Sequence, residues 1–323
     1  MKLSAKLTAW YRRGHRDLPW RRTSDPYRIW VSEIMLQQTR AQAAIPYYER
    51  FLERFPTVEA LAAATETEVL TLWAGLGYYS RARNLHRAAR EIAGRGFPRD
   101  YESIRALPGI GDYTAAAVAS IAFQLPHAVV DGNVLRVVSR LTADAADIGS
   151  ARTRQRFRAV VEGWLDPQAP GVFNQALMEL GATICLPKNP RCTECPLRAE
   201  CLAHQQGKAA QFPVKLRKKE PVAIAAVLLL LRRNGRVLLR RRDDAERRMA
   251  GFWELPMPEH LPGARVGRTL GRFRHTITHH HFTFTVKAAT LGTGAHGCTW
   301  FSNVQLNEIP LSTTARKALR ASV

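Results

Sequence analysis

The sequence lacks any long apolar run. The longest such run, Val222 to Leu231, has ten residues, whereas a membrane-spanning helix needs about 20. This excludes an integral membrane protein built on apolar helices. The first residues carry charge, but no apolar segment follows them, so no secretory signal is expected. We therefore expect a cytoplasmic location.

Cysteine and acidic residues are also scarce. Five cysteines in 323 residues are too few for a disulfide scaffold. The 48 Lys and Arg residues exceed the 27 Asp and Glu residues, so the formal net charge is +21. An excess of this size favours a polyanionic partner, above all nucleic acid, over a small-molecule substrate. A hydrophobic content of 46% excludes a disordered chain.

The pattern of the chain changes after its first two thirds. Residues 1–207 show apolar residues at helical spacing, broken by Pro and Gly, and predict a mostly helical domain. Residues 208–221 are basic and predict a linker, although a solvated loop fits equally well. Residues 222–323 predict a smaller α+β domain. The length agrees with two domains.

Local signals support this division. Thr65 followed by Glu68 forms a capping box, and residues 114–123 form an alanine-rich helix that can pack closely on its neighbours. In the second part, Asn234-Gly235 predicts a hairpin turn. Residues 282–287 alternate as in a half-buried strand, and residues 313–320 predict a short basic helix.

Four of the cysteines lie close together, with six, two and five residues between them, which is typical of metal ligation. Zinc and an iron–sulfur cluster both accept four cysteine ligands. A single C-x2-C pair and the intervening prolines favour a [4Fe–4S] cluster over two zinc knuckles. The fifth cysteine, Cys298, is expected to be an ordinary half-buried thiol. The predicted cluster ligands are Cys185, Cys192, Cys195 and Cys201.

Two short segments of the predicted helical domain, both before the cysteines, contain residues that could bind or react. In Leu107-Pro108-Gly109-Ile110-Gly111 the two glycines allow a tight turn before a helix, whose first amides can bind a phosphate. The motif by itself is also compatible with a plain turn. Asp131 lies between Val130 and Gly132, before another helix. It can cap that helix, or its charge can stabilise an oxocarbenium-like sugar.

The cysteine spacing, the hairpin and the aspartate resemble the endonuclease III family of helix-hairpin-helix glycosylases. Within that family, residues 18–21, 25–27 and 30–39 resemble adenine DNA glycosylases of the MutY type. The resemblance covers nearly the whole chain. It implies a helix-hairpin-helix catalytic domain with an iron–sulfur loop, followed by a lesion-recognition domain, and it implies double-stranded DNA as the partner.

Four residues match the catalytic positions of the family. Glu33, an acid among apolar residues, matches the general acid that protonates the leaving adenine. Asp131 matches the carboxylate that faces the sugar, and Asn133 a residue that orients the catalytic groups. Tyr113 stands where related bifunctional enzymes carry a Schiff-base lysine, which implies hydrolysis without strand cleavage. A core-packing tyrosine is the alternative for Tyr113.

Other matches concern binding. Trp20, Arg21 and Gln175 resemble residues of the adenine pocket, and an amide suits the edge of adenine. The remaining matches are expected to bind DNA or to enter the base stack beside the lesion, which offsets part of the unstacking cost. They are Gln38, Thr39, Leu76, Tyr78, Gly109 and Gly111.

The second domain resembles the Nudix-like domain of the same enzymes, on residues 249–256. The glutamate-rich helix that binds metal in Nudix hydrolases is missing, so recognition of 8-oxoguanine is expected rather than pyrophosphate hydrolysis. The family's lesion-reading loop is usually Phe-Ser-His, whereas this chain has Ile277-Thr278-His279. Thr278 and His279 keep the hydroxyl and the ring, but the aromatic member is lost.

The resemblance therefore implies a monomeric, monofunctional adenine DNA glycosylase that acts on adenine paired with 8-oxoguanine or guanine on nucleoid DNA. Two alternatives remain. One is a bifunctional glycosylase and lyase for oxidised pyrimidines, which Tyr113 argues against. The other is an iron–sulfur DNA sensor without catalysis, which the presence of both carboxylates argues against.

Overall fold

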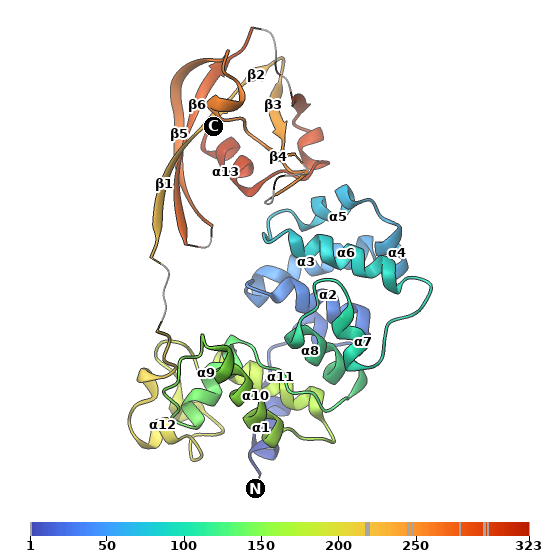
Figure 1. Cartoon of the computed structure of the whole chain (residues 1–323), viewed down its shortest axis with the longest axis vertical. Coiled ribbons are helices and arrows are strands. Elements are labelled where there is room, and N and C mark those ends of the chain that lie inside the picture. The colour runs from blue at the N-terminus through green and yellow to red at the C-terminus, as the bar shows by residue number, and fades with distance from the viewer. Residues whose placement is uncertain are drawn as a thin grey trace. The chain divides into compact units, whose positions relative to one another are not determined.

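The computed structural model describes residues 2–216, 220–243, 246, 249–277, 279–292, 295 and 297–322. The chain forms two compact units (Figure 1). The first contains Met1–Glu59 and Arg87–Lys218, and the second contains Ala60–His86 and Lys219–Val323. No helix in the described part of the chain is both long enough and apolar enough to cross a membrane.

The first part of the chain is helical, as predicted. The helices up to residue 205 are α1 (Leu3–Gly14), α2 (Pro26–Leu36), α3 (Ala41–Arg54), α4 (Val58–Ala63), α5 (Glu66–Trp73), α6 (Ser80–Ile92), α7 (Tyr101–Ala106), α8 (Asp112–Phe123), α9 (Gly132–Leu141), α10 (Ala151–Trp164), α11 (Pro170–Thr183) and α12 (Leu202–Gln205). Short 3-10 turns lie at Pro19–Arg21, Cys192–Glu194 and Ala209–Gln211.

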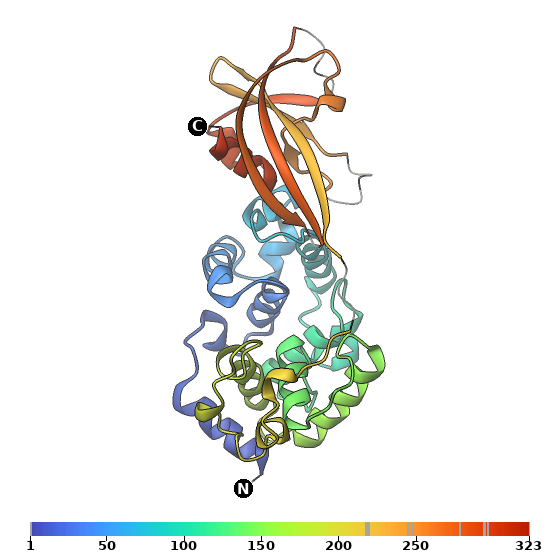
Figure 2. The ribbon, with the colours of Figure 1, turned by 90° about the vertical axis from the view of Figure 1, so that its left-hand side faces the viewer.

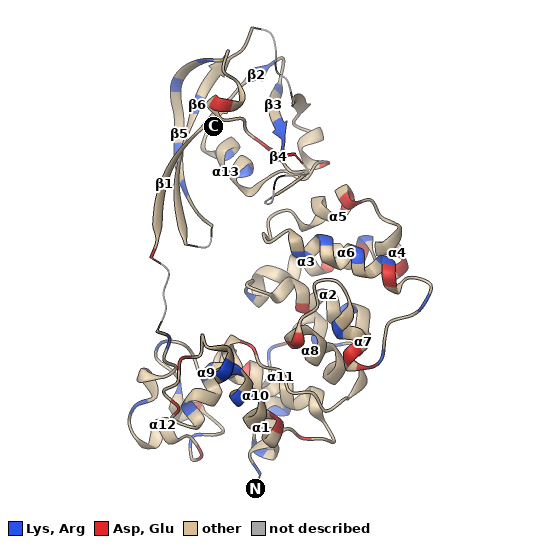
Figure 3. Cartoon of the chain, viewed as in Figure 1, with Lys and Arg blue, Asp and Glu red and all other residues tan. Residues whose placement is uncertain are grey.

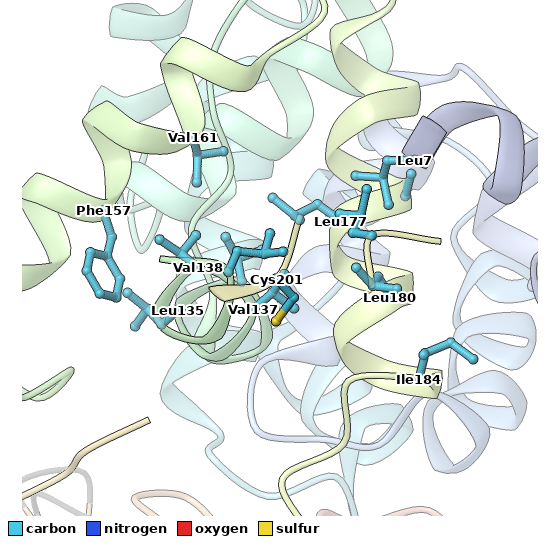
Figure 4. Close-up of a cluster of buried hydrophobic side chains, with 14 of the residues drawn as sticks. Leu7, Leu135, Val137, Val138, Phe157, Val161, Leu177, Leu180, Ile184 and Cys201 are labelled. Carbon is cyan, nitrogen blue, oxygen red and sulfur yellow. The ribbon is translucent and has the colours of Figure 1, made fainter. Parts of the chain in front are cut away.

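The main core of the first unit lies between α1, α9, α10 and α11 (Figure 4). Leu7, Val138, Phe157 and Leu177 meet there and are almost completely buried. Cys201, one of the predicted ligands, belongs to the same cluster. The apolar faces of these helices therefore hold the cysteine loop against α9.

Two glycines of α11 allow the helices that carry the site to approach closely. A Cβ at Gly171 would lie 2.6 Å from the carbonyl oxygen of Ser120 in α8. A Cβ at Gly181 would lie 2.6 Å from the Cβ of Asn133 in α9. Larger residues here would push α8 and α9 away from α11. The alanine-rich α8, with Ala115 and Ala117 fully buried, supports the same close packing.

Besides the helices of residues 60–86, the described part of the second unit contains two small sheets and the helix α13. One sheet has the order β1-β6-β5 and the other contains β2, β3, β4 and β7; Figure 2 shows the three long strands of the first sheet side by side. The elements are β1 (Val222–Leu230), β2 (Arg232–Arg233), β3 (Arg236–Arg241), β4 (Trp253–Glu254), β5 (Arg265–Ile277), β6 (His280–Thr290), β7 (Cys298–Ser302) and α13 (Thr313–Ala321).

The local predictions for the second part are confirmed. Asn234 and Gly235 both have positive φ, 49° and 70°, and join β2 to β3. Phe284 of β6 is buried while Thr283 is exposed, as the alternation predicted. The expected basic helix is α13. The hairpin pairs the short β2 with β3, whereas β1 runs parallel to β6. The apolar residues of β1 are divided between two cores.

Residues 60–86 group with the second unit rather than with the other helices. The ring of Tyr79 lies 4.0 Å from that of buried Phe252, centroid to centroid. Arg83 donates a hydrogen bond to the carbonyl oxygen of Ala250. These contacts join distant segments and explain why residues 60–86 group with the second unit; the domain bounds expected from the sequence stay a prediction. Within this segment, the capping box of Thr65 and Glu68 is confirmed.

The start of the expected linker is packed chain. Phe212 is buried in the core of the first unit, and the amide of Ile148 donates to the carbonyl oxygen of Val214 at 3.1 Å. The buried ring of Phe212 and the hydrogen bond to Val214 fix residues 209–214 against the first unit. Residues 217–219 lie outside the described part.

Candidate active site and cysteine loop

Glu33 is a buried acid in the middle of α2. Its neighbours Trp30 and Ile34 are buried, and Glu33 itself is 4% exposed. Asp25 begins α2, since its side chain accepts a hydrogen bond from the amide of Tyr27. Burial raises the pKa of Glu33 to about 7, and the negative charge of Asp131 adds to this shift. Glu33 is therefore mostly protonated below pH 7 and about half protonated at pH 7, so a large fraction of it can act as a general acid.

Tyr113, in the first turn of α8, touches Glu33 directly. Its hydroxyl donates a hydrogen bond of 2.6 Å to Oε2 of Glu33. This bond favours the ionised acid and opposes the effect of burial on the pKa of Glu33. The Tyr113 side chain also packs against the buried cluster of Ala116, Ala117 and Val129, so the catalytic role and the core-packing alternative both stay predictions.

Asp131 caps α9 and is also placed to act as a charge. Its Oδ1 accepts from the amide of Val134 at 2.7 Å, and its Oδ2 accepts from Nδ2 of Asn133 at 2.9 Å. Burial raises the pKa of Asp131, and these two hydrogen bonds oppose that rise by favouring the carboxylate. The capping interpretation is therefore confirmed, and the catalytic role of Asp131 stays a prediction.

Asn133 is held in turn by Arg136. The Nη2 atom of Arg136 donates to Oδ1 of Asn133 and to the carbonyl oxygen of Gly181, both at 2.8 Å. Its Nε donates to the carbonyl oxygen of Cys185 at 2.8 Å. Asn133 thus has a fixed amide orientation, with its nitrogen facing Asp131. The sequence did not predict Arg136.

The three helices α2, α8 and α9 bring a protonated acid and a hydrogen-bonded carboxylate into one electrostatically coupled site. Tyr113 is sensitive to both acids. Burial raises the pKa of the Tyr113 hydroxyl, and the negative charges of Glu33 and Asp131 both raise it further. Such a pair can protonate a leaving group and stabilise a positive sugar. The roles of the individual residues stay predictions.

The predicted adenine-binding residues lie in the same unit. Trp20 is buried and packs edge-on against Tyr48, with centroids 5.4 Å apart. Gln175 accepts a hydrogen bond of 3.1 Å at Oε1 from the hydroxyl of Tyr11. The guanidinium of Arg21 lies 5.4 Å from the centroid of the Tyr11 ring. Tyr11 therefore connects Gln175 and Arg21.

Glu179, which the sequence analysis missed, fixes Arg21. Its carboxylate accepts from Arg16 and from Arg21, each at 2.7 Å. Burial alone would raise the pKa of Glu179, but these hydrogen bonds lower it to about 2. The sequence of α11 contains one acid among mostly apolar residues. The same pattern identified Glu33, so Glu179 could have been predicted as a buried functional acid.

The hairpin before α8 has the predicted shape in part. Gly109 has a φ of 76°, which favours glycine, whereas Gly111 has an ordinary φ of −101° and precedes the first residue of α8. Both are exposed. After α2, Gln38 is exposed with a φ of 58°, and the hydroxyl of Thr39 donates to the carbonyl oxygen of Gln37 at 3.5 Å.

Leu76 and Tyr78 belong to the second unit, on a turn with unusual backbone angles. Gly77 and Tyr78 have φ values of 74° and 49°. The turn is held by Arg81, whose Nη2 donates to the carbonyl oxygen of Gly77 at 3.2 Å. Leu76 is half-buried, but Tyr78 is 45% exposed. Tyr78 is thus available on the surface rather than part of the core.

The predicted lesion-reading residues follow β5. Thr278 lies outside the described residues. The carbonyl oxygen of His279 accepts from the amide of Val222 at 2.8 Å, and its ring is 4.1 Å from that of His280, centroid to centroid. His279 is half-buried at the end of the β5–β6 hairpin.

The four clustered cysteines line one cavity. Apolar side chains, three arginines and one histidine complete its wall; the residues are Val137, Arg140, Leu141, Leu180, Ile184, Cys185, Pro190, Arg191, Cys192, Cys195, Arg198, Cys201, His204 and Ala209. Among the described residues, no three His, Cys, Asp or Glu side chains form a group that could hold a metal ion. A [4Fe–4S] cluster needs a different arrangement, because each iron takes its own thiolate, and four cysteines around a cavity fit it.

Two protein families match this chain. Residues 31–162 match the HhH-GPD superfamily base excision DNA repair protein family, and residues 226–321 match the NUDIX domain. The first match contains α8, with Tyr113, and α9, and the second contains both sheets except residues 222–225 of β1.

Individual relatives agree with these matches. The chain is 45% identical over 218 residues to the adenine DNA glycosylase of Homo sapiens, covering 64% of this chain and 40% of that protein. It is 38% identical over 214 residues to that of Buchnera aphidicola subsp. Acyrthosiphon pisum, covering 65% and 61%. The matched regions span less than two thirds of the length of these relatives.

Solved structures share the fold of the first part. A thermostable thymine-DNA glycosylase gives a TM-score of 0.56 at 29% identity, covering 63% of this chain and 95% of that one. Endonuclease III in a non-covalent complex with DNA gives 0.53 at 21%, covering 63% and 94%. The chain therefore contains an HhH-GPD base excision DNA repair domain with an endonuclease III-like fold, followed by a NUDIX domain, and it is similar to the adenine DNA glycosylases.

Proposed function

We propose that this protein is a monofunctional adenine DNA glycosylase. The observation that carries the proposal is the buried Glu33, with a pKa near 7, in one hydrogen-bonded site with Tyr113 and electrostatically coupled to Asp131. The similarity to adenine DNA glycosylases supports adenine as the base. The basic charge of the chain supports DNA as the substrate.

In the proposed reaction, Glu33 protonates adenine that has been flipped out of the helix, so the base leaves as a neutral molecule. Asp131 stays ionised and stabilises the oxocarbenium-like sugar until water adds. Tyr113 has no amine and forms no Schiff base, so the strand remains uncut. Trp20, Arg21 and Gln175 hold the flipped base.

We further propose that the base opposite adenine is 8-oxoguanine or guanine. The exposed Tyr78, with Leu76 beside it, enters the base stack and offsets part of the unstacking cost of a few kcal/mol. Gln38 and Thr39 are separately proposed to bind the DNA. The second unit reads the lesion near Thr278 and His279. Figure 3 shows basic residues on β5, whose sequence contains four arginines and no acid, as a DNA-facing strand requires.

The direct test is a single-turnover excision assay on one duplex in which the base opposite adenine is varied. Rapid excision opposite 8-oxoguanine and guanine, with slow excision opposite thymine, is expected. Borohydride should trap no covalent adduct, whereas a trapped adduct would favour a lyase. Inactivity on every duplex would contradict the proposal. We also propose that the protein acts as a monomer on nucleoid DNA in the cytoplasm.

A Tyr113→Phe variant should excise adenine about fivefold more slowly, because the loss of one hydrogen bond costs about 1 kcal/mol and frees Glu33 to turn. The lost O–H donor had lowered the pKa of Glu33, so the alkaline fall in rate should move to higher pH. Rates measured from pH 5 to 9 check this. Tyr47→Phe, on α3 with its ring against Arg50, is the control; an unmoved alkaline limb would contradict the assignment.

A His279→Ala variant should lose about tenfold of its preference for 8-oxoguanine over guanine, which corresponds to one hydrogen bond of about 1.4 kcal/mol. Its excision rate at saturating enzyme should be unchanged, since the chemistry lies in the first unit. His281→Ala, an exposed neighbour on β6, serves as the control. Equal discrimination by His279→Ala and the wild type would argue against a reading role.

We propose that the cysteine cavity holds a [4Fe–4S] cluster. Cys185, Cys192, Cys195 and Cys201 would be its ligands, and the cluster would tie the loop between α11 and α12 to α9. When bound, the group supplies a rigid, negatively charged cross-link and a one-electron redox centre.

Replacing one ligand should empty the site. The wild type is expected to contain about four irons per chain, whereas Cys195→Ser should lose most of them together with the visible absorption. Iron and sulfide analysis of the purified protein measures this. Cys298→Ser, which lies outside the cavity, should retain wild-type iron. Full iron in Cys195→Ser would rule out this set of ligands.

A further inference from the structure

Arg140 is a buried cation in the wall of the cysteine cavity. It lies in the last turn of α9 and is 2% exposed. Its Nη1 donates to Sγ of Cys185 at 3.2 Å and to the carbonyl oxygen of Leu186 at 2.7 Å. Its Nη2 donates to the carbonyl oxygen of Pro187 at 3.3 Å. One side of the guanidinium therefore holds the start of the cysteine loop.

The other side of Arg140 holds the chain that follows the loop. Its Nε donates to the carbonyl oxygens of Ala209 and Phe212, at 2.9 and 3.0 Å. The backbone carbonyl oxygen of Arg140 accepts from Sγ of Cys201 at 3.4 Å. A single residue thus contacts the first and the last of the four cysteines and the segments on both sides of them.

The charge of Arg140 has no carboxylate partner among the described residues. All of its recorded acceptors are neutral carbonyl oxygens or a cysteine sulfur. Arg21 is also buried, but it pairs with Glu179 at 2.7 Å. An unpaired buried charge is strongly unfavourable, so buried charges are paired or bind a charged group. The acceptors around Arg140 orient it toward the cavity without neutralising it.

A [4Fe–4S] cluster with four thiolate ligands carries a net negative charge. We infer that Arg140 is the counter-charge of this cluster and that it sets both the retention of the cluster and its reduction potential. The inference rests on the proposed cluster. A positive charge and a hydrogen bond at a ligand sulfur both favour the more negative, reduced state and so raise the potential.

The test compares three variants of the full-length protein. Arg140→Met removes the charge and keeps a chain of similar shape, and Arg140→Lys keeps the charge but not the planar set of donors. Arg191→Gln is the matched control. Arg191 lines the same cavity, but its side chain is 57% exposed and lies 3.9 Å from Glu194, so solvent screens its charge.

Iron content and the rate of iron loss to a chelator are measured first, followed by the potential of the one-electron couple at an electrode. Arg140→Met is expected to lose iron at least tenfold faster than the wild type. Its potential should fall by about 59 mV or more, equivalent to a tenfold change in the ratio of oxidised to reduced cluster. Arg140→Lys should lie between the two, and Arg191→Gln should match the wild type.

A second measurement uses the melting temperature before and after iron removal. Removing the cluster leaves Arg140 without a counter-charge, so the wild type should lose more thermal stability than Arg140→Met does. An equal or smaller loss in the wild type would overturn the inference, as would unchanged iron loss and potential in Arg140→Met.

The outcomes separate this inference from the proposed cluster. Wild-type protein without iron would overturn both. If the wild type contains iron and Arg140→Met has the same iron content, rate of iron loss and potential, only the role of Arg140 is overturned. If Arg140→Met yields no folded protein, Arg140→Lys decides. A cluster retained in Arg140→Lys supports the role of the charge. A failure of Arg140→Lys equal to that of Arg140→Met overturns that role and assigns the effect to the hydrogen-bond geometry.

Discussion

A Glu33→Gln variant is expected to excise adenine about 10²- to 10⁴-fold more slowly than the wild type, the usual contribution of a general acid. Glutamine has the shape of the neutral acid but no proton to give. Binding to the mispaired duplex should be unchanged, because the side chain of Glu33 is buried in α2. Single-turnover rates and duplex affinity measure the two effects separately.

The pH dependence sharpens this prediction. Glu33 has a pKa near 7, so the wild-type rate should fall as the pH rises through 7 and the acid loses its proton. The residual rate of Glu33→Gln should lack this alkaline limb. Glu49→Gln, an exposed acid on α3, should retain both the rate and the limb. Full activity in Glu33→Gln would show that Glu33 is not the general acid.

The same substitution should stabilise the folded protein at alkaline pH. Folding raises the pKa of Glu33 from 4.5 to about 7, so the folded state binds the proton more tightly than the unfolded state. The wild type therefore loses stability relative to Glu33→Gln as the pH rises from about 4.5 to about 7, by roughly 3 kcal/mol. Denaturant unfolding at pH 4 and pH 8 measures the difference, which should be absent at pH 4.

Replacing Asp131 with asparagine should have the second large effect on catalysis. The loss of one preorganised charge is expected to lower the excision rate about 10²- to 10³-fold. Asparagine caps helices as well as aspartate does, so α9 should keep its stability. Unfolding free energies and single-turnover rates distinguish the lost charge from a lost cap.

A matched control exists for Asp131→Asn. Asp100 also caps a helix, α7, where it accepts from the amide of Ser103 at 2.8 Å, and Asp100→Asn should change neither rate nor stability. The charge of Asp131 raises the pKa of Glu33, so Asp131→Asn should move the alkaline limb to lower pH, opposite to Tyr113→Phe. Equal rates in Asp131→Asn and Asp100→Asn would show that capping is the whole role of Asp131.

Local features of the fold were predictable from sequence because they depend on nearest neighbours. The capping box at Thr65, the turn at Asn234 and the alternation in β6 each follow from a few adjacent residues, and each is confirmed. The parallel pairing of β1 with β6 was not predicted. Its partner lies more than fifty residues away, and an apolar run does not specify which strand it joins.

The candidate site divides in the same way. The sequence by itself determined which residue types are available: an acid in an apolar helix, an aspartate at a helix start, and four cysteines within one short loop. Only the tertiary structure decided that the hydroxyl of Tyr113 reaches Glu33 from 80 residues away, and that Arg140 is buried against the cysteine loop. The reason is physical: burial and electrostatic potential at one atom depend on groups from the whole unit, and no local pattern contains them.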